Sequence, residues 1–223
     1  MKRDCMFFVA DLNMMETFKG FLTRSQFHKS IGCGPFVFDS LTDIRHAGGI
    51  ADGLHIRVAR DDKLSLLLRG YQNTHYKLVV ALDCEFDCEF DGSPRQTVIR
   101  RNLSLELQNI GWSAADFIVL AIEPELEQWI WQDSVHVEAA LKHRAPPSLR
   151  EVLLQQGVWP DGEPKPNNPK ETLKDVVFKN KVRRSSAIYG EIARKVSVKH
   201  CVDPEFQRLM AQLRIWFPAE GAT

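Results

Sequence analysis

Three apolar runs of strand length, each followed at once by an acidic residue, constrain the fold of this chain more than any other feature. The runs cover residues 6–10, 76–82 and 117–122, and the acids that follow them are Asp11, Asp83 and Glu123. Near-continuous apolar strands are typical of parallel sheets that helices cover on both faces. The carboxyl ends of parallel strands meet at one edge of the sheet, where functional groups gather. The sequence therefore predicts an α/β fold with a shared acidic site at that edge.

The segments between these runs show mostly helical spacing. Asn13 suits the N-cap of a helix that extends to Leu22, and a second helix is expected from Pro94 to about Asn109. Residues 35–39 are a further short strand candidate, whereas residues 64–68 fit a helix and a strand equally well. Strand and helix thus alternate from residue 6 to about residue 122. This alternation predicts a mainly parallel sheet with right-handed crossovers.

The third apolar run leads into the densest acidic stretch of the chain. Carboxylates occupy every second position there: Asp83, Glu85, Asp87, Glu89 and Asp91. Acids this close repel one another unless water solvates them or a cation holds them. Asp and Glu oxygens are the ligands that Mg²⁺ takes. We therefore expect Asp83, Glu85 and Asp87 to hold Mg²⁺ or Mn²⁺, with a solvated loop before the Gly92–Pro94 turn as the alternative.

A further pair of acids follows the fourth strand candidate. Pro124 suits the first turn of a helix, which would place Glu123 and Glu127 on one face, four residues apart. Both are candidate ligands of a second metal ion. Acids at a helix start are also favoured by the helix dipole, which is a purely structural alternative.

The composition changes after residue 143. A Pro-rich linker begins at Arg144, Ser148 is a candidate helix start, and residues 157–168 are rich in Pro and Gly. Helices are expected at about 170–179, 185–196 and 203–214. We accordingly predict an α/β domain over residues 1–143 and a helical extension over residues 144–223.

The extension is locally basic, although the whole chain has 29 basic and 29 acidic residues and a net charge of +0. Attraction to nucleic acid must therefore be local. Lysine and arginine contact phosphates in most protein–nucleic acid complexes. A solvated helix face, or one that matches the acidic loop, is the alternative. The candidate nucleic-acid-binding residues are Lys179, Lys181, Arg183, Arg184, Arg194 and Lys195.

Cysteine usage bears on the compartment. The chain has five scattered cysteines, an odd number, and no apparent secretory signal, so we expect reduced thiols in the cytoplasm. No apolar stretch has the length of a membrane span. Zinc at Cys84, Cys88 and His75 would lack the second ligand pair of a tetrahedral site.

Several short motifs along the chain match one known pattern. The stretch Asp11–Phe18 is similar to Glu-Gly-x-Thr-Glu-x-x-Phe after a first strand, and Asp83-Cys84-Glu85 to an Asp-x-Asp pair. Residues 122–133 are similar to a later Ile-x-x-x-Glu-x-Trp pattern, in which Glu127 matches the glutamate, and Tyr189 matches a tyrosine of the closing helices. On these motifs the chain resembles a Toprim-related family of uncharacterised bacterial proteins near the OLD-type nuclease domains.

The resemblance implies a Toprim-like sheet with a C-terminal helical extension and a Mg²⁺ or Mn²⁺ site. Asp11, Asp83 and Glu85 would be catalytic in the cleavage of nucleic acid, and Glu123 or Glu127 would hold a second ion. Relatives of this kind occur in bacterial phage-defence loci, including methylation-associated ones. The resemblance thus implies an antiviral defence component whose partners are other proteins of the same locus.

The same motifs depart from the pattern at the first strand. Leu12 replaces the turn glycine, Met15 replaces the second glutamate, and Asp11 is one methylene shorter than the first. Catalysis by positioned groups tolerates little misplacement. The alternative is therefore a catalytically degenerate module that binds partner proteins or nucleic acid. Trp131, Trp159 and Trp216 are candidate interface residues for it, although core packing is the commoner fate of such side chains.

Overall fold

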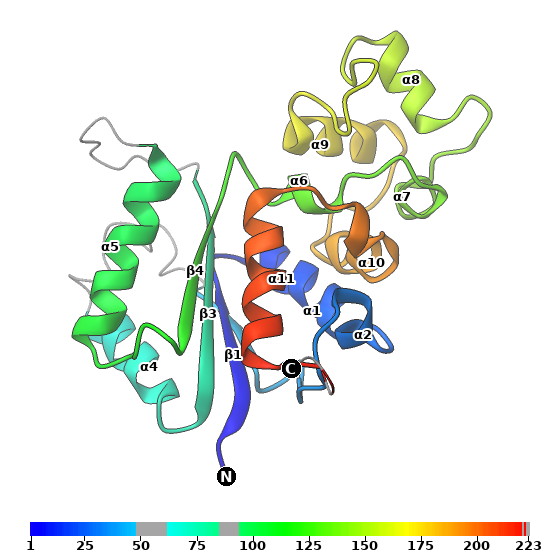
Figure 1. Cartoon of the computed structure of the whole chain (residues 1–223). Helices are drawn as coiled ribbons and strands as arrows, with labels where there is room; N and C mark the ends of the chain where they lie inside the picture. The colour runs from blue at the N-terminus through cyan, green and yellow to red at the C-terminus, as the bar shows by residue number, and fades with distance from the viewer. Residues whose placement is uncertain (48–61, 85–93, 220, 222–223) are drawn as a thin grey trace.

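A computed structural model describes residues 1–47, 62–84, 94–219 and 221, and a four-stranded parallel sheet lies at its centre (Figure 1). The strands pair in the order β2-β1-β3-β4, and each pairing is parallel. This confirms the predicted α/β class with a parallel sheet. The strands are β1 (Arg3–Val9), β2 (Ile44–His46), β3 (His75–Asp83) and β4 (Phe117–Ile122).

The apolar runs form strands because the sheet buries them on both faces. Every residue of β4 is buried, and so are the last five residues of β1. The strand predicted at residues 35–39 is wrong. Phe36 and Phe38 do pack on the core, against Phe217 and Phe7, but the Val37 and Asp39 amides donate to side-chain carboxylates and not to the backbone of a strand. The Val37 N–H donates to Asp4 at 2.6 Å, for example.

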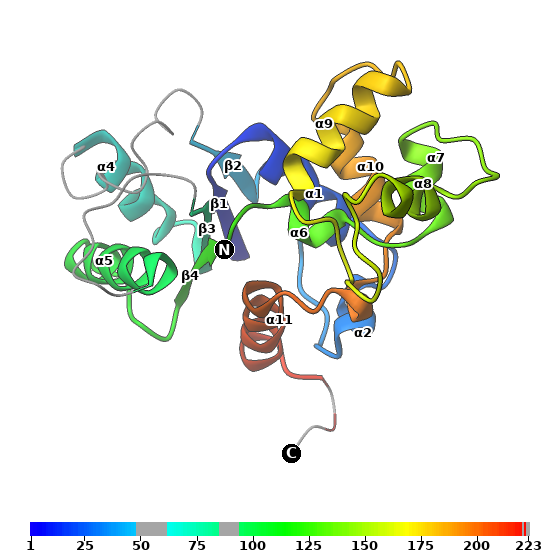
Figure 2. The ribbon, with the colours of Figure 1, turned by 90° about the horizontal axis from the view of Figure 1, so that it is seen from above.

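Helices cover both faces of the sheet (Figure 2). α4 (Asp62–Tyr71) and α5 (Arg95–Asn109) lie on one side, so the stretch at residues 64–68 is helical. α1 (Leu12–Leu22) and α11 (Pro204–Trp216) lie on the other side. α2 (Phe27–Ile31) follows α1. The sheet is therefore the middle layer of three.

The second half of the chain is helical, as predicted. Its elements are α6 (Glu127–Ile130), α7 (Val135–Ala140), α8 (Leu149–Gln155), α9 (Pro169–Lys179), α10 (Ala187–Lys195) and the 3₁₀ turn η2 (Val198–His200), before α11. Ser148 begins α8 with a capping box, in which its hydroxyl bonds the Glu151 amide. α10 packs against α1, and α11 packs against β4. Contacts thus cross residue 143, and the domain boundary that we place there stays a prediction.

α1 and α10 meet at a pair of glycines. A Cβ on Gly20 would lie 2.6 Å from the carbonyl oxygen of Gly190 and 2.8 Å from the Cβ of Ala193. A Cβ on Gly190 would lie 3.1 Å from the carbonyl oxygen of Glu16. The helix backbones therefore touch, which fixes the position of α10 and of its residue Tyr189.

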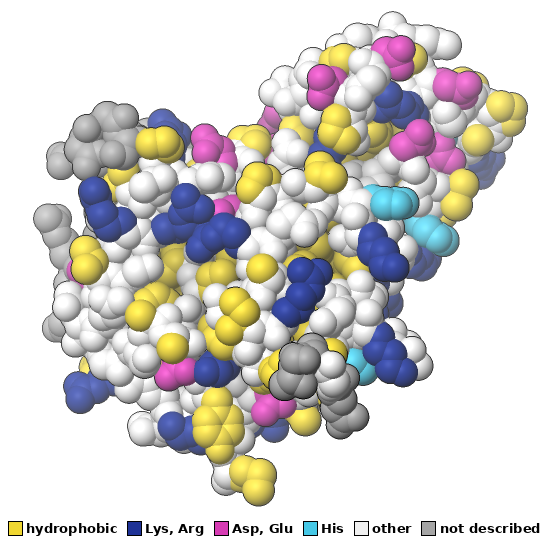
Figure 3. All heavy atoms as spheres, in the orientation of Figure 1, with side chains coloured by type: hydrophobic (Ala, Val, Ile, Leu, Met, Phe, Trp, Pro, Cys, Tyr) yellow, Lys and Arg dark blue, Asp and Glu magenta, His cyan; other side chains and the backbone are white. Residues whose placement is uncertain are grey.

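α11 is joined to the outer strand β4 by a buried carboxylate. Glu205 is 1% exposed, and it accepts a hydrogen bond from the Ala121 backbone N–H at 2.9 Å. Arg100 of α5 and Arg208 of α11 donate to the same carboxylate at 2.6 and 2.8 Å. Figure 3 shows Lys and Arg side chains on this face between α5 and α11. Glu205 thus satisfies an amide that a fifth strand would otherwise bond.

Among the described residues, no helix combines the length and the hydropathy that a membrane crossing requires. The described cysteines, Cys5, Cys33, Cys84 and Cys201, are buried free thiols. His75 begins β3 and Cys84 follows its end, so the zinc alternative would join opposite ends of one strand.

Candidate functional site

The sheet brings the acids at the carboxyl ends of β1, β3 and β4 to one edge, as the sequence predicts. Val9 pairs with Ala81, and Asp83 pairs with Ile122. Asp11 follows β1 by two residues and Glu123 follows β4 directly. Glu85 and Asp87, which we predict as further ligands, lie outside the described residues, as do Glu89, Asp91 and Cys88.

Asp11 has a structural role at this edge. Its Oδ1 atom accepts the Met14 backbone N–H at 2.8 Å, so Asp11 is the N-cap of α1. The prediction that Asn13 is the cap is wrong, because the helix already begins at Leu12. Asp11 is exposed, so its carboxylate remains accessible to solvent beside the cap bond.

Glu127 is the most unusual acid of the edge. Its side chain is 2% exposed at the start of α6, and its Oε1 atom accepts a hydrogen bond from the Tyr189 hydroxyl at 2.5 Å. Within the described part of the chain, its Oε2 atom is buried and has no hydrogen-bond partner. A buried acceptor that lacks a partner is costly, by about 1–3 kcal/mol, and calls for an explanation.

The electrostatics place Glu127 close to the other acids. Burial raises the pKa of Glu127, the hydrogen bond from Tyr189 and the positive charge of Lys170 oppose the rise, and the negative charge of Asp11 adds a smaller increase. Burial also raises the pKa of Tyr189, and the charges of Glu127, Asp11 and Asp83 add to this effect. We call Asp11, Asp83, Glu127 and Tyr189 the acidic edge, because the charges of all three acids raise the pKa of the Tyr189 hydroxyl.

Glu123 lies apart from this group. We expected Glu123 and Glu127 on one helix face, but α6 begins only at Glu127, and that prediction is wrong. The segment before α6 turns toward α9, because buried Glu125 accepts the Lys170 backbone N–H at 2.6 Å. Glu123 is exposed and lines a cavity that the residues of the acidic edge do not line.

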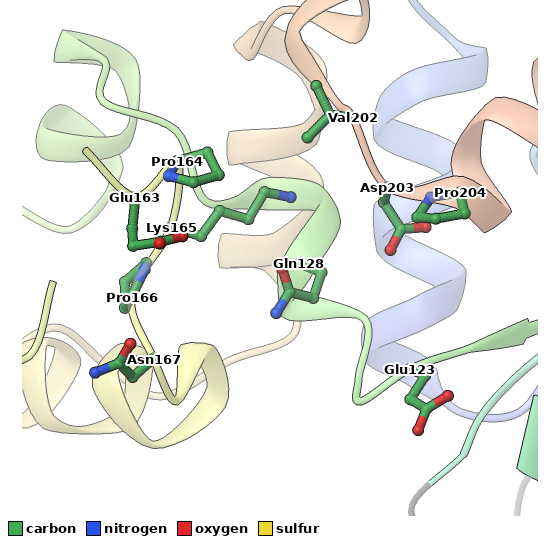
Figure 4. Close-up of a pocket in the computed structure, with 10 residues that line it drawn as sticks. All are labelled: Glu123, Gln128, Glu163, Pro164, Lys165, Pro166, Asn167, Val202, Asp203 and Pro204. Carbon is green, nitrogen blue, oxygen red and sulfur yellow. The ribbon is translucent and has the colours of Figure 1, made fainter. Parts of the chain in front are cut away.

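That cavity has a volume of about 390 Å³ and is shown in Figure 4. The Lys165 side chain extends from its loop toward Gln128 of α6, and Asp203 lies across from it. Burial lowers the pKa of Lys165, and the charges of Cys201 and Asp203 oppose the decrease. Burial raises the pKa of Cys201 to about 11, so this thiol is protonated at neutral pH.

The acidic edge fits a divalent cation in the kind of its donors but is not a complete cage. Carboxylate oxygens suit Mg²⁺ and Mn²⁺, and the buried Oε2 of Glu127 is an acceptor for which a cation would account. The described residues contain no group of at least three His, Cys, Asp or Glu side chains arranged to hold a metal ion. A complete set would need Glu85 or Asp87 as well.

The predicted basic residues are all exposed and come from two segments of the chain. Lys179 ends α9, Lys181, Arg183 and Arg184 follow it, and Arg194 and Lys195 end α10. Lys195 pairs with Glu191 on its own helix at 3.4 Å. Arg184 lines a second cavity, of about 540 Å³, together with Lys170, Lys174 and Tyr189.

Sequence reasoning missed Lys170 and Lys174 as site residues, although their spacing of four on α9 puts both on one helix face. It identified Tyr189 through the family pattern alone, without a role. Of the three tryptophans considered for an interface, two take the core-packing alternative. Trp131 and Trp159 are each 1% exposed, and their ring N–H groups donate to the carbonyls of Pro169 and Glu163. They are core residues, while Trp216 is half-buried.

Comparison of this chain with protein-family models, with curated proteins and with solved structures gives no match. Its function is therefore inferred from its own residues.

Proposed function

We propose that the acidic edge is a Toprim-like site that binds Mg²⁺ or Mn²⁺ and cleaves nucleic acid, in a bacterial antiviral defence component. The observation that carries the proposal is the buried Oε2 of Glu127, which has no hydrogen-bond partner in the described part of the chain. Tyr189, the hydrogen-bond partner of Glu127, is influenced by the charges of Asp11 and Asp83, two acids at the carboxyl ends of parallel strands, where α/β proteins place their sites. The resemblance of the motifs supplies the defence setting.

Each residue of the edge has a part in this proposal. Asp83 and Glu127 hold the cation, with Glu85 and Asp87 as further ligands in the adjoining segment. The cation, when bound, stabilises negative charge that develops on a phosphodiester. Tyr189 orients Glu127 through the hydrogen bond to Oε1 and leaves Oε2 for the cation. Asp11 orients the first turn of α1 and adds negative charge to the edge.

A second candidate function is a degenerate module that binds partner defence proteins or nucleic acid without cleavage. The structure offers a specific reason for it. One carboxylate oxygen of Asp11 accepts the hydrogen bond that caps α1. Met15 packs against the core at the position where the family pattern has a second glutamate. Both residues then stabilise the fold, and the ligands of a metal ion would come from Asp83, Glu127 and the adjoining acidic segment.

Calorimetric titration with Mg²⁺ and with Mn²⁺ separates the two functions. We expect the wild type to bind and both Asp83→Asn and Glu127→Gln to lose binding by at least about tenfold, because each variant removes a charged ligand. Glu123→Gln is the matched control, since Glu123 is exposed at the same sheet edge but lines the other cavity. Equal binding by Asp83→Asn, Glu127→Gln and Glu123→Gln would place any metal elsewhere and contradict the proposal.

Cleavage is tested with the same proteins on single-stranded and duplex DNA and RNA. Metal binding together with cleavage that Asp83→Asn abolishes would support the nuclease. Metal-independent association with partner proteins, without cleavage, would favour the degenerate module.

A further inference from the structure

The cavity of about 540 Å³ has the composition of a nucleotide site. It lies between α9 and α10, and its volume is within the range of about 300–1,000 Å³ of small-molecule pockets. Among the described residues that line it, Lys170, Lys174 and Arg184 give its wall positive charge and Asp175 supplies one carboxylate. Buried apolar side chains of α9, among them Leu173 and Val177, line the same wall. Charged and apolar surfaces thus meet in one hollow.

An aromatic ring lies at this cavity without cover from the described part of the chain. Phe178 lines the cavity from the last turn of α9, and its side chain is 85% exposed. The ring is thus accessible from solvent, and every nucleic-acid base has a face that can stack on such a ring. Lys174, one turn before Phe178, pairs with Glu171 at 2.5 Å, but a partly exposed pair of this kind is weak and yields to phosphate.

The cavity adjoins the acidic edge through Tyr189. Tyr189 lines the cavity and donates its hydroxyl to Glu127 at 2.5 Å. Asn13 lines the cavity from α1, two residues after Asp11. A nucleotide in the cavity would therefore have its phosphate near the basic wall. The next nucleotide of the nucleic-acid strand would be directed toward the acidic edge.

We propose that this cavity binds one nucleotide of a single-stranded nucleic acid, with the base stacked on Phe178 and the phosphate held by Lys174 and Arg184. A base within a duplex is stacked on its neighbours and is not available to an isolated ring. The inference rests on the proposed function only for the cleavage of the nucleic-acid strand after it has bound. The binding itself requires no metal.

Binding is measured by fluorescence anisotropy with a labelled twelve-residue oligothymidine and with a blunt duplex of equal length, both in EDTA. The single strand is expected to bind more tightly than the duplex. Phe178→Ala should weaken single-strand binding by about tenfold, the effect of losing one stacked base. Phe178→Tyr keeps the ring and should bind as the wild type does. Val135→Ala, another exposed apolar truncation, is the matched control.

Arg184→Gln tests the phosphate contact. It should weaken binding and reduce the slope of log affinity against log salt by about 0.7, the value for one phosphate contact to a single strand. Arg183→Gln is its control, because Arg183 is the exposed neighbour that does not line the cavity. An equal effect of both substitutions would show a diffuse charge attraction and overturn the assignment.

Other outcomes also overturn the inference: no binding of the oligothymidine, equal or tighter binding of the duplex, or wild-type affinity of Phe178→Ala. If Phe178→Ala instead abolishes self-association in sedimentation, the groove is a protein interface. Metal titration separates this inference from the proposed function. Single-strand binding without metal binding supports the cavity and refutes the metal site. Metal binding together with cleavage that Phe178→Ala leaves unchanged supports the metal site and refutes the cavity.

Discussion

Replacing Glu205 with alanine is expected to lower the free energy of unfolding by about 3 kcal/mol. The substitution leaves the Ala121 backbone N–H of β4 buried without its acceptor, at a cost of about 1–3 kcal/mol. It also removes the ion pairs with Arg100 and Arg208, whose side chains are 27% and 41% exposed. Because solvent screens such partly exposed partners, each pair adds only about 0.5 kcal/mol.

Urea unfolding and thermal unfolding followed by circular dichroism measure this loss. For a chain of 223 residues, about 3 kcal/mol corresponds to a decrease in Tm of about 6–12 °C. Glu205→Gln keeps an oxygen for the Ala121 amide and should fall between alanine and wild type. Glu191→Ala is the control, since Glu191 forms an exposed ion pair with Lys195 and should change stability by less than about 0.5 kcal/mol. If Glu205→Ala matches this control, the buried carboxylate does not stabilise the edge of the sheet.

Other expected outcomes concern the helix crossing and a buried pair at the start of β3, in which His75 Nε2 lies 3.3 Å from Asp43 Oδ1. Gly20→Ala should destabilise the fold and separate α10 from α1, because the new Cβ would lie 2.6 Å from the Gly190 carbonyl oxygen. Gly157→Ala is the comparison, since nothing lies within 4 Å of its Cβ and only the positive φ causes strain there. Equal losses of Tm in the two variants would refute a steric cause at Gly20. Stability should fall as the pH drops below 6.5, the ordinary pKa of His75, because burial lowers the pKa of His75 and the unfolded chain binds that proton more strongly. Burial raises the pKa of Asp43, but hydrogen bonds from Arg3, the Asp39 amide and His75 outweigh it and lower the pKa, so a further loss is expected below its ordinary value of 3.8. Urea midpoints at pH 7.5 and 5.0 check the first loss, and an identical decrease in His75→Gln would assign it to other groups.

The main strands could be predicted from the sequence because each is an uninterrupted apolar run, and burial on both faces leaves few other structures for such a run. β2 could not, because only Ile44 of its three residues is buried and no periodicity is visible over that length. Phe36 and Phe38 imitate a strand by alternating with exposed neighbours, yet they pack from an irregular segment.

The site was predictable in its location and less so in its members. Parallel strands bring Asp11 and Asp83 to one edge whatever the loops do. The partner of Glu127 is Tyr189, which is 62 residues away in the chain, and the sequence pattern around Glu127 indicated an exposed helix face instead. Such pairings depend on how α10 crosses α1, which local spacing does not encode.

The glycine crossing also sets the order in which the chain acquires its structure during synthesis. The α1 segment and the end of α10 are joined by hydrogen bonds from Arg24 to residues about 170 positions later. At a translation rate of about 5–20 residues per second, roughly 10–30 s separate the synthesis of the two helices. The apolar face of α1 lacks its partner throughout this interval, and Tyr189 does not yet exist to orient Glu127. A nascent chain therefore carries no finished acidic edge, and any activity of that edge begins only after α10 has docked.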